Sequence, residues 1–491
     1  MQKHLNTAFS AAFAVAVWLF WWLRFPYDLG FQEQNQLLLF TRSYVADALA
    51  DSGGLACLAA EFITQFYCIK WLGSLLLAGV FLLLQLMVWK AARTIGAARD
   101  CRYLLSFLPS AVLLVHMGDI YAMLAFPVAL ILALAAFLPL SRLEHKTLYL
   151  ILTIPAGFWL IGPAIYITVA LHILTNWSYK RAQSLWAVAY TAAVVALFYN
   201  LFQTQFPIKD VIFGIEYYRM PVVLPPLQLA VAILTALVPW AMAKLPEVKC
   251  GPLHQSILFV VLLGATFCFT NVTFDRDTHE LIAYDQMVRS EDWNGIISSA
   301  RKHPLKSEPA CVCLNLSLMM TGQFQNMFDF YQCGVEGLVM PRVRDFISNV
   351  GSYEAFWRLG FVNTAMRYAF DSQESEGNNQ KSGRHTSKLV ECHIVNGNYA
   401  VAAKYINLLK HSLFYRSWAQ DMEKFLYNDA AVESHPVYGY LRYSRFHDDF
   451  LYNYGEMDKM LAILYNINNN NIMAGYYFQA YKNLEKMGGD R

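Results

Sequence analysis

The stretch SILFVVLLGATFCFTNVTFDRDTHE, residues 256–280, is where the chain changes character. Its first part is apolar, and from Asp275 onward charged residues recur every few positions. A transmembrane helix needs about 20 predominantly apolar residues, and no run after this point is long or apolar enough. The sequence therefore predicts an all-α protein: a transmembrane helical bundle over residues 1–272 and a soluble helical domain over residues 273–491.

Composition supports a membrane protein and excludes several other classes. Hydrophobic residues make up 56% of the chain and charged residues 15%, whereas about a quarter of the residues in soluble proteins are charged. A formal net charge of +2 argues against a nucleic-acid partner, which would favour a strongly basic surface. The glycines are not spaced as in phosphate-binding loops or dinucleotide-binding turns, so we expect no nucleotide, flavin or haem cofactor. The expected partner of the first half is the lipid bilayer.

Nine apolar runs are candidate membrane spans, and the third, fifth and sixth are short enough to need shielding within a bundle. They lie near residues 7–23, 71–89, 103–116, 121–140, 147–160, 162–177, 184–202, 226–243 and 254–272. The first run continues through several tryptophans into Arg24 without a small-residue cleavage site, which indicates an uncleaved anchor rather than a signal peptide.

Basic residues in the short loops predict the orientation. The richer set of loops holds Lys3, Lys90, Arg93, Arg99, Arg102, Arg142, Lys146, Lys180, Arg181, Lys244 and Lys249. The poorer set holds Arg24, Arg42, Lys70, Lys209 and Arg219. Because Lys and Arg are in excess in cytoplasmic loops, the N-terminus should be cytoplasmic. An odd number of spans then places the C-terminal domain outside, which in a bacterial inner membrane means the periplasm.

The C-terminal domain has a loose helical repeat. Gly322, Gly360 and Gly397 each follow an apolar segment and precede a second segment with aromatic and alanine positions. Their spacing is in the range of helix-pair solenoids such as tetratricopeptide repeats, and glycine suits the end of a helix. We therefore predict a tetratricopeptide-like domain that offers a surface to a protein partner; the alternative is an irregular helical domain. The polar stretch 371–388 predicts a mobile surface loop.

Four cysteines lie in this domain: Cys311, Cys313, Cys333 and Cys392. An oxidising periplasm would allow them to pair, and the sequence leaves the pairing open. A Cys-x-Cys spacing without a second pair or a nearby histidine is a poor zinc site, so we expect no metal.

The candidate catalytic residues lie in the first outer loop. Asp28 and Glu33 stand between the first span and an apolar patch, and ionisable groups at membrane depth are often functional. An equally weighted interpretation is a plain amphipathic helix that lies on the membrane.

Two other outer loops supply candidate binding residues. His116 and Asp119 flank a tight turn, where Asp119 would otherwise cap the next helix. Tyr218 and Arg219 lie in the loop before the eighth span. An arginine can hold a phosphate group through two hydrogen bonds, or it can simply anchor an aromatic belt at the interface.

This layout resembles that of GT-C glycosyltransferases, in which a many-helix bundle carries an acidic residue in the first outer loop. It is also similar to eukaryotic O-mannosyltransferases that end in tetratricopeptide repeats, and to an uncharacterised bacterial family of polytopic proteins with a repeat-containing tail. The resemblance implies that Glu33, or else Asp28, acts as general base. It also implies that Arg219 and Tyr218 hold the phosphate of a polyprenyl-phosphate sugar.

A non-enzymatic scaffold is the alternative hypothesis. The bundle would then anchor the repeat domain, and the repeats would recruit periplasmic partners. Secondary transport is less favoured, because the bundle shows no matching pair of interrupted halves.

Overall fold

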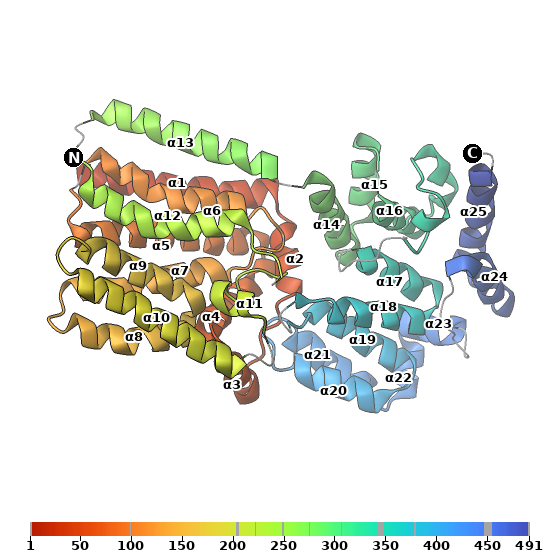
Figure 1. The fold of residues 1–491 in the computed structure, drawn as a ribbon. Helices are drawn as coiled ribbons and strands as arrows, with labels where there is room; N and C mark the ends of the chain where they lie inside the picture. Colours follow the sequence, from red (N-terminus) through yellow and green to blue (C-terminus); the bar gives the residue numbers. More distant parts are fainter. Residues whose placement is uncertain are drawn as a thin grey trace. The chain divides into compact units, whose positions relative to one another are not determined.

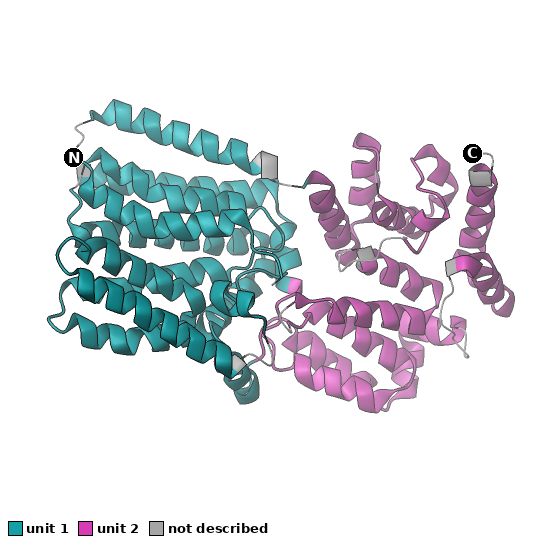
Figure 2. Ribbon diagram, viewed as in Figure 1, with its two compact units in different colours: residues 1–33, 40–275 teal, residues 34–39, 276–491 magenta. Residues whose placement is uncertain are grey.

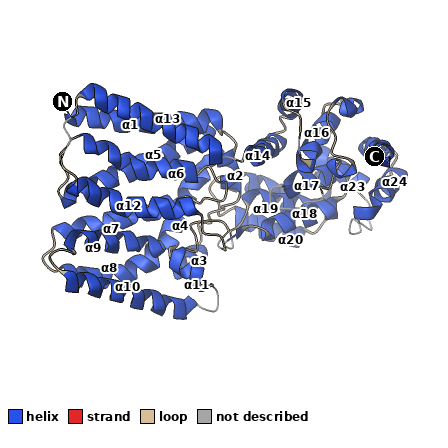
Figure 3. Ribbon diagram, turned by 45° about the horizontal axis from the view of Figure 1, so that its top comes forward, coloured by secondary structure: helices blue, strands red, loops and turns tan. Residues whose placement is uncertain are grey.

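The computed structural model describes residues 2–98, 100–202, 206–220, 222–247, 250–273, 275–305, 307–341, 348–377, 380–445 and 454–489. Arg99 and Lys249, two of the basic loop residues counted above, lie outside these ranges. The described chain is helical throughout and forms no strand, apart from an isolated antiparallel bridge between Ala122 and Tyr218 (Figure 3).

Two compact units divide the chain, as Figure 2 shows. The bundle unit comprises Met1–Glu33 and Phe40–Asp275. The tail unit comprises Arg276–Arg491 together with Gln34–Leu39, a short segment of the first loop. One segment of the tail unit, Gln34–Leu39, therefore comes before most of the bundle in the sequence.

The bundle unit contains thirteen α-helices among its described residues, labelled in Figure 1. They are α1 (Gln2–Arg24), α2 (Asp28–Gln34), α3 (Arg42–Ala50), α4 (Gly54–Gln65), α5 (Lys70–Ile95), α6 (Leu108–His116), α7 (Ala125–Phe137), α8 (Lys146–Ile161), α9 (Ile165–Asn176), α10 (Arg181–Phe202), α11 (Ile208–Phe213), α12 (Pro226–Lys244) and α13 (Pro252–Thr273). Among the described residues, six helical stretches are long and apolar enough to cross a membrane.

One of these six stretches is a hairpin and not a straight helix. It runs for 31 residues through α8 and α9. Near its start, Gln183 of α10 donates to Thr147 at 3.0 Å, and Tyr190 of α10 donates to the carbonyl of Ile151 at 3.0 Å. Residue numbers rise together in the two helices, so α8 and α10 are parallel, and α9 between them must run back. The reversal falls at Gly162, whose φ of 69° favours glycine.

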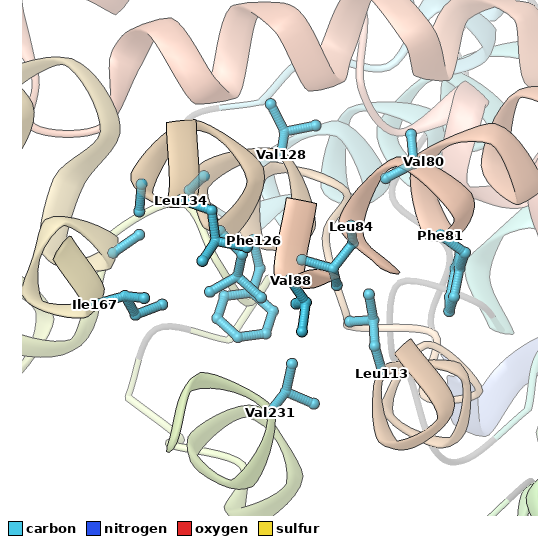
Figure 4. Packing of buried hydrophobic residues seen from close by; sticks show 14 of the residues in the cluster. Val80, Phe81, Leu84, Val88, Leu113, Phe126, Val128, Leu134, Ile167 and Val231 are labelled. Atoms are coloured by element: carbon cyan, nitrogen blue, oxygen red, sulfur yellow. The ribbon is translucent and has the colours of Figure 1, made fainter. Parts of the chain in front are cut away.

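Helices α5, α6, α7, α9 and α12 share the apolar centre of the bundle (Figure 4). Leu84 and Val88 of α5 are fully buried there, as are Leu113 of α6, Leu134 of α7 and Val231 of α12. Lipid tails are as apolar as these side chains, so the cohesion of such helices comes mainly from close van der Waals packing.

The first and last helices of the bundle are parallel. Phe9 and Phe259, near the starts of α1 and α13, stack with ring centroids 4.8 Å apart. Phe20 and Phe267, nearer the ends of the same helices, also have centroids 4.8 Å apart. The end of α13 therefore lies at the same end of the bundle as the end of α1.

The tail unit is a succession of shorter helices. They are α14 (Arg276–Arg289), α15 (Trp293–Lys302), α16 (Glu308–Met320), α17 (Ser348–Leu359), α18 (Val362–Glu374), α19 (Gly383–Val395), α20 (Tyr399–Leu409), α21 (Arg416–Met422), α22 (Asp429–Ser434), α23 (Pro436–Ser444), α24 (Met457–Ile467) and α25 (Ile472–Gly489). Consecutive helices from α16 to α20 pack against one another.

The three repeat glycines sit in turns. Gly322, Gly360 and Gly397 have φ values of 71°, 95° and 76°, in the left-handed region in which helices commonly end. After Gly360 and Gly397 the chain starts a new α-helix, giving the pairs α17–α18 and α19–α20. After Gly322 it instead forms a short 3-10 helix, Phe324–Asp329, so the first of the three units departs from the pattern.

The prediction of a mobile surface loop over residues 371–388 is wrong for the two ends of this stretch, 371–374 and 383–388, which are helical. Helix α18 continues to Glu374, and α19 starts at Gly383. Arg384, His385 and Lys388 are buried despite their polarity. The sequence signal failed because Arg384 and Lys388 find acidic partners within the tail unit, which a count of polar residues does not reveal.

Candidate functional site

The two candidate catalytic acids lie on the short helix α2, which follows α1 after a tight turn. Asp28 is in the first turn of α2, where a carboxylate interacts favourably with the helix dipole. Glu33 lies near its end. The side chains are 6% and 2% exposed, so both carboxylates are buried.

The structure brings the four candidate binding residues together from two loops. The Tyr218 hydroxyl donates to Asp119 Oδ2 at 2.7 Å, and the His116 ring stacks on Tyr218 with centroids 6.4 Å apart. The backbone N–H of Arg219 donates to the carbonyl of Tyr121 at 2.9 Å, which ties the loops to each other.

Arg219 also connects these loops to α2. Its guanidinium carbon lies 5.9 Å from the ring centroid of Phe31, which stands between Asp28 and Glu33 on the helix. Asp119 accepts from the backbone N–H of Tyr121 at 2.9 Å within the turn. It does not cap the next helix, because α7 starts at Ala125 with Leu124 as its N-cap residue. Burial, followed by the neighbouring Asp119, raises the pKa of Tyr218, which keeps the phenol protonated as a donor.

Two spaces among the described residues of the bundle unit can be compared with the six candidate residues, Asp28, Glu33, His116, Asp119, Tyr218 and Arg219. A cavity of about 520 Å³ is lined by α9, α10 and α11, and its lining residues are nearly all apolar. None of the six belongs to it. A second space, of about 10 Å³, includes Tyr218 and none of the other five. Of the six residues, therefore, only Tyr218 borders either of these two spaces.

A second acidic group lies on α4. Glu61 accepts from the Tyr44 hydroxyl at 2.8 Å and from the Cys57 thiol at 3.2 Å. The same thiol lies 3.8 Å from a carboxylate oxygen of Glu216. Cys57 and Glu61 are four residues apart, so the sequence alone predicts that they share one face of a helix. Tyr44 and Glu216 come close to them only in the folded chain.

The tail unit contains a cavity of about 510 Å³, within the usual range for ligand pockets. Its wall comes from α14, α17, α19, α21 and α23. The charged lining residues are Arg289, Glu291, Glu354, Arg358, Arg384, Lys388 and Glu391. The aromatic ones are Trp357, Tyr415, Trp418, His435 and Tyr438.

Helix α19 supplies the centre of this wall. Arg384, Lys388 and Glu391 recur at helical spacing and so share one face. Arg384 Nη1 lies 2.6 Å from Asp285 Oδ2, and Lys388 Nζ lies 3.3 Å from Glu354 and 2.8 Å from Glu391. Charged residues are rarely buried unless paired in this way.

These pairs hold the side chains in their charged forms. Burial alone would lower the pKa of Arg384 and of Lys388, but the neighbouring acids outweigh it and raise both pKa values. Burial alone would likewise raise the pKa of Glu354, yet Lys388 and two arginines lower it. Sequence reasoning missed this site because it assigned Arg384 and Lys388 to a surface loop.

The first-loop segment contributes to the same network within the tail unit. Gln34 Oε1 accepts from Arg384 Nη1 at 3.1 Å and from Gln286 Nε2 at 3.0 Å. The backbone N–H of Leu37 donates to the carbonyl of Lys381 at 2.8 Å. Among the residues described, no group of three or more His, Cys, Asp or Glu side chains is placed to hold a metal ion.

Comparison with known proteins gives a family and no activity. No curated protein and no solved structure matches the chain. A family model matches residues 3–486, nearly the whole length. The chain belongs to that family, a family of unknown function designated DUF6057.

Proposed function

We propose that this protein is a polytopic protein of a bacterial inner membrane whose periplasmic tail recruits a ligand or a protein partner. The observation that carries the proposal is the polar cavity of the tail unit, with its buried and paired charges. Such pairs add little net stability compared with apolar packing, so their presence in a cavity wall favours a binding role. The bundle unit then serves as the anchor.

The geometry of the bundle supports this orientation. The hairpin at Gly162 gives α8 and α9 one crossing each, which supports nine crossings in all. The parallel course of α1 and α13 supports an N-terminus and a tail on opposite sides. The segment Gln34–Leu39 comes after α1 and the short helix α2 and belongs to the tail unit, which supports the first loop and the tail being on the same side of the membrane.

The proposal includes a tetratricopeptide-like arrangement of the tail. It is supported by the pairs α17–α18 and α19–α20 and by the left-handed glycines that end α17 and α19. Helix-pair repeats commonly bind partners on an extended surface, and α17 and α19 both contribute to the cavity wall.

A site-specific photocrosslinker tests the recruiting function in intact cells. Benzoylphenylalanine at Ser387, in the cavity wall, should form a defined adduct after irradiation. The same group at Lys404, exposed on α20 and outside the cavity wall, is the matched control. No adduct at position 387, or equal adducts at both positions, would contradict a recruiting cavity.

A GT-C-type glycosyltransferase is the second candidate. It is favoured by one observation: Phe31 places the helix of Asp28 and Glu33 beside the loop of Tyr218 and Arg219. Glu33, or else Asp28, would act as the general base that takes the proton of an acceptor hydroxyl. Arg219 and Tyr218, with His116 and Asp119 beside them, would hold the phosphate of a polyprenyl-phosphate sugar.

Transfer in reconstituted liposomes tests this second candidate. A radiolabelled polyprenyl-phosphate hexose is supplied as donor, and Glu33→Gln should abolish transfer while the protein still inserts. Glu485→Gln, at an exposed position of α25, is the control. Full transfer by the Glu33→Gln variant would end the catalytic assignment.

A further inference from the structure

The cavity of the tail unit contains a fixed guanidinium group with spare hydrogen-bonding capacity. Arg384 is only 6% exposed and belongs to the cavity wall. Its Nη1 is held by Asp285 and Gln34, which fixes the plane of the group. Its Nη2 is buried and has no hydrogen-bond partner among the described residues. A buried donor without a partner costs free energy that a bound acceptor would recover.

A second guanidinium group of the same wall has the same property. Arg358 Nη2 donates to Glu291 at 2.8 Å, and its Nε is buried without a hydrogen-bond partner among the residues described. The guanidinium carbon lies 5.1 Å from the ring centroid of Trp293, which limits its freedom to turn. Glu291 is 64% exposed, so its hold on Arg358 is weak and open to competition.

The acids that face the interior of the cavity are already satisfied. Glu354 and Glu391 both pair with Lys388, and Glu391 also accepts from the Tyr438 hydroxyl at 3.1 Å. The wall contains four basic and three acidic side chains. Asp285, which lies outside the wall, balances the charge of Arg384. What the wall has to spare is therefore hydrogen-bond donors, at Arg384 Nη2 and Arg358 Nε, so a fitting ligand brings acceptors.

The remaining wall decides between a peptide and a sugar. Trp357 is 3% exposed, and Lys388 Nζ lies 4.7 Å from its ring centroid, so its face is not open to a sugar ring. Val288, Val437 and Trp418 instead provide apolar contact for a side chain. From these contacts we infer that the cavity binds a short acidic peptide segment, with Arg384 and Arg358 as the donors to its carboxylate.

This inference rests on the proposed recruiting function and names the ligand class. A carboxylate matches a guanidinium group because its two oxygens can accept parallel N–H donors. The carboxylate has two sources in a peptide, the C-terminus and an Asp or Glu side chain. The experiment separates them.

Fluorescence polarisation with the full-length protein in nanodiscs provides the test. The probes are a fluorescein-labelled Gly-Ser-Trp-Leu-Glu-Asp with a free C-terminus, its C-terminal amide, and the neutral Gly-Ser-Trp-Leu-Gln-Asn amide. The first should bind, and the neutral peptide should bind about tenfold more weakly or not at all. Retained binding of the acidic amide assigns the side chains as the source, and its loss assigns the C-terminus.

Two variants should change the affinity for the acidic peptide in opposite directions. Arg358→Gln removes a donor and should weaken binding about tenfold. Glu291→Gln removes the competing surface carboxylate and should strengthen binding by about threefold. Arg367→Gln, which removes an exposed cation that pairs with Asp371, is the control and should leave binding unchanged.

Several outcomes would overturn the inference: equal binding of the neutral peptide, no weakening in Arg358→Gln, weaker binding in Glu291→Gln, or displacement of the probe by chitohexaose or inorganic phosphate at lower concentration than by the unlabelled acidic peptide. If no peptide binds while the crosslink at Ser387 still forms, the ligand class is wrong and the recruiting function stands. If the crosslink is also absent, both fail.

Discussion

The sulfur atoms of Cys311 and Cys333 lie 3.0 Å apart in the tail unit. If the tail is periplasmic, an oxidising environment should join these two cysteines as a disulfide. Cys313 and Cys392 are buried and should stay as thiols. Labelling the unfolded protein with maleimide-polyethylene glycol, before and after reduction, should reveal two additional reactive thiols after reduction, and Cys333→Ser should remove that difference.

A second pair of thiols serves as an internal reference for the orientation of the bundle. Cys101 and Cys250 are in side-chain contact near the loops predicted to be cytoplasmic. A reducing cytosol should keep both as thiols. The same labelling, applied to single-pair variants, distinguishes the two sites. An oxidised Cys101–Cys250 pair together with a reduced Cys311–Cys333 pair would reverse the proposed orientation.

Breaking the buried Arg384–Asp285 pair should destabilise the tail far more than breaking an exposed pair. Asp285→Asn leaves a buried guanidinium group without its counter-charge, which should cost about 3–5 kcal/mol. Arg367→Ala, which removes the exposed pair with Asp371, should cost at most about 0.5 kcal/mol. Thermal unfolding of the full-length protein in detergent, followed by tryptophan fluorescence, compares the two. Equal losses of stability would mean that the buried pair contributes nothing specific.

Acid should weaken the tail through Glu354. Lys388, Arg358 and Arg384 lower the pKa of this carboxyl below its ordinary value of 4.5. Its contribution to stability is therefore fully present above about pH 4.5 and is lost as the pH falls through the lowered pKa. Unfolding midpoints measured from pH 7 downward should fall more steeply in the wild-type protein than in Glu354→Gln. Parallel curves for the two proteins would exclude this coupling.

Alanine at the two turn glycines should have unequal costs. Gly397→Ala places a side chain at positive φ with only Arg442 nearby, at 3.9 Å, and should cost about 1–2 kcal/mol. At Gly360 the same change meets the carbonyl oxygen of Ser444 at 3.3 Å in addition to the strain. We expect the lower unfolding midpoint for Gly360→Ala. A neutral result at both positions would remove the argument from left-handed turns.

Local patterns in the sequence predicted much of the architecture. The change of composition around Asp275 predicted an apolar helical part and a polar helical part, and six helical stretches with the length and hydropathy of membrane spans lie before it. The turn at Gly397 followed from a glycine between two helical patterns, and its φ is positive. Such signals are carried by neighbours along the chain, so no knowledge of the fold is needed to detect them.

The sequence predicted the candidate site only in part. The sequence identified Tyr218 and Asp119 separately, and their hydrogen bond joins residues from different loops. It assigned Arg384 to a mobile segment, because a polar stretch has the same composition whether its side chains face water or one another. Its partner Asp285 lies far away along the chain, so the local sequence pattern does not predict their ion pair.

Hydropathy and glycine placement alone determined that this chain has helices long and apolar enough to span a membrane, followed by a polar helical tail, because both signals act over one or two turns of helix. Tertiary structure decided which charges meet. The guanidinium group of Arg384 is held by Asp285 and by Gln34, a residue of the first loop. Only the folded chain sets these distances, and buried charges remain charged only where partners stand within reach.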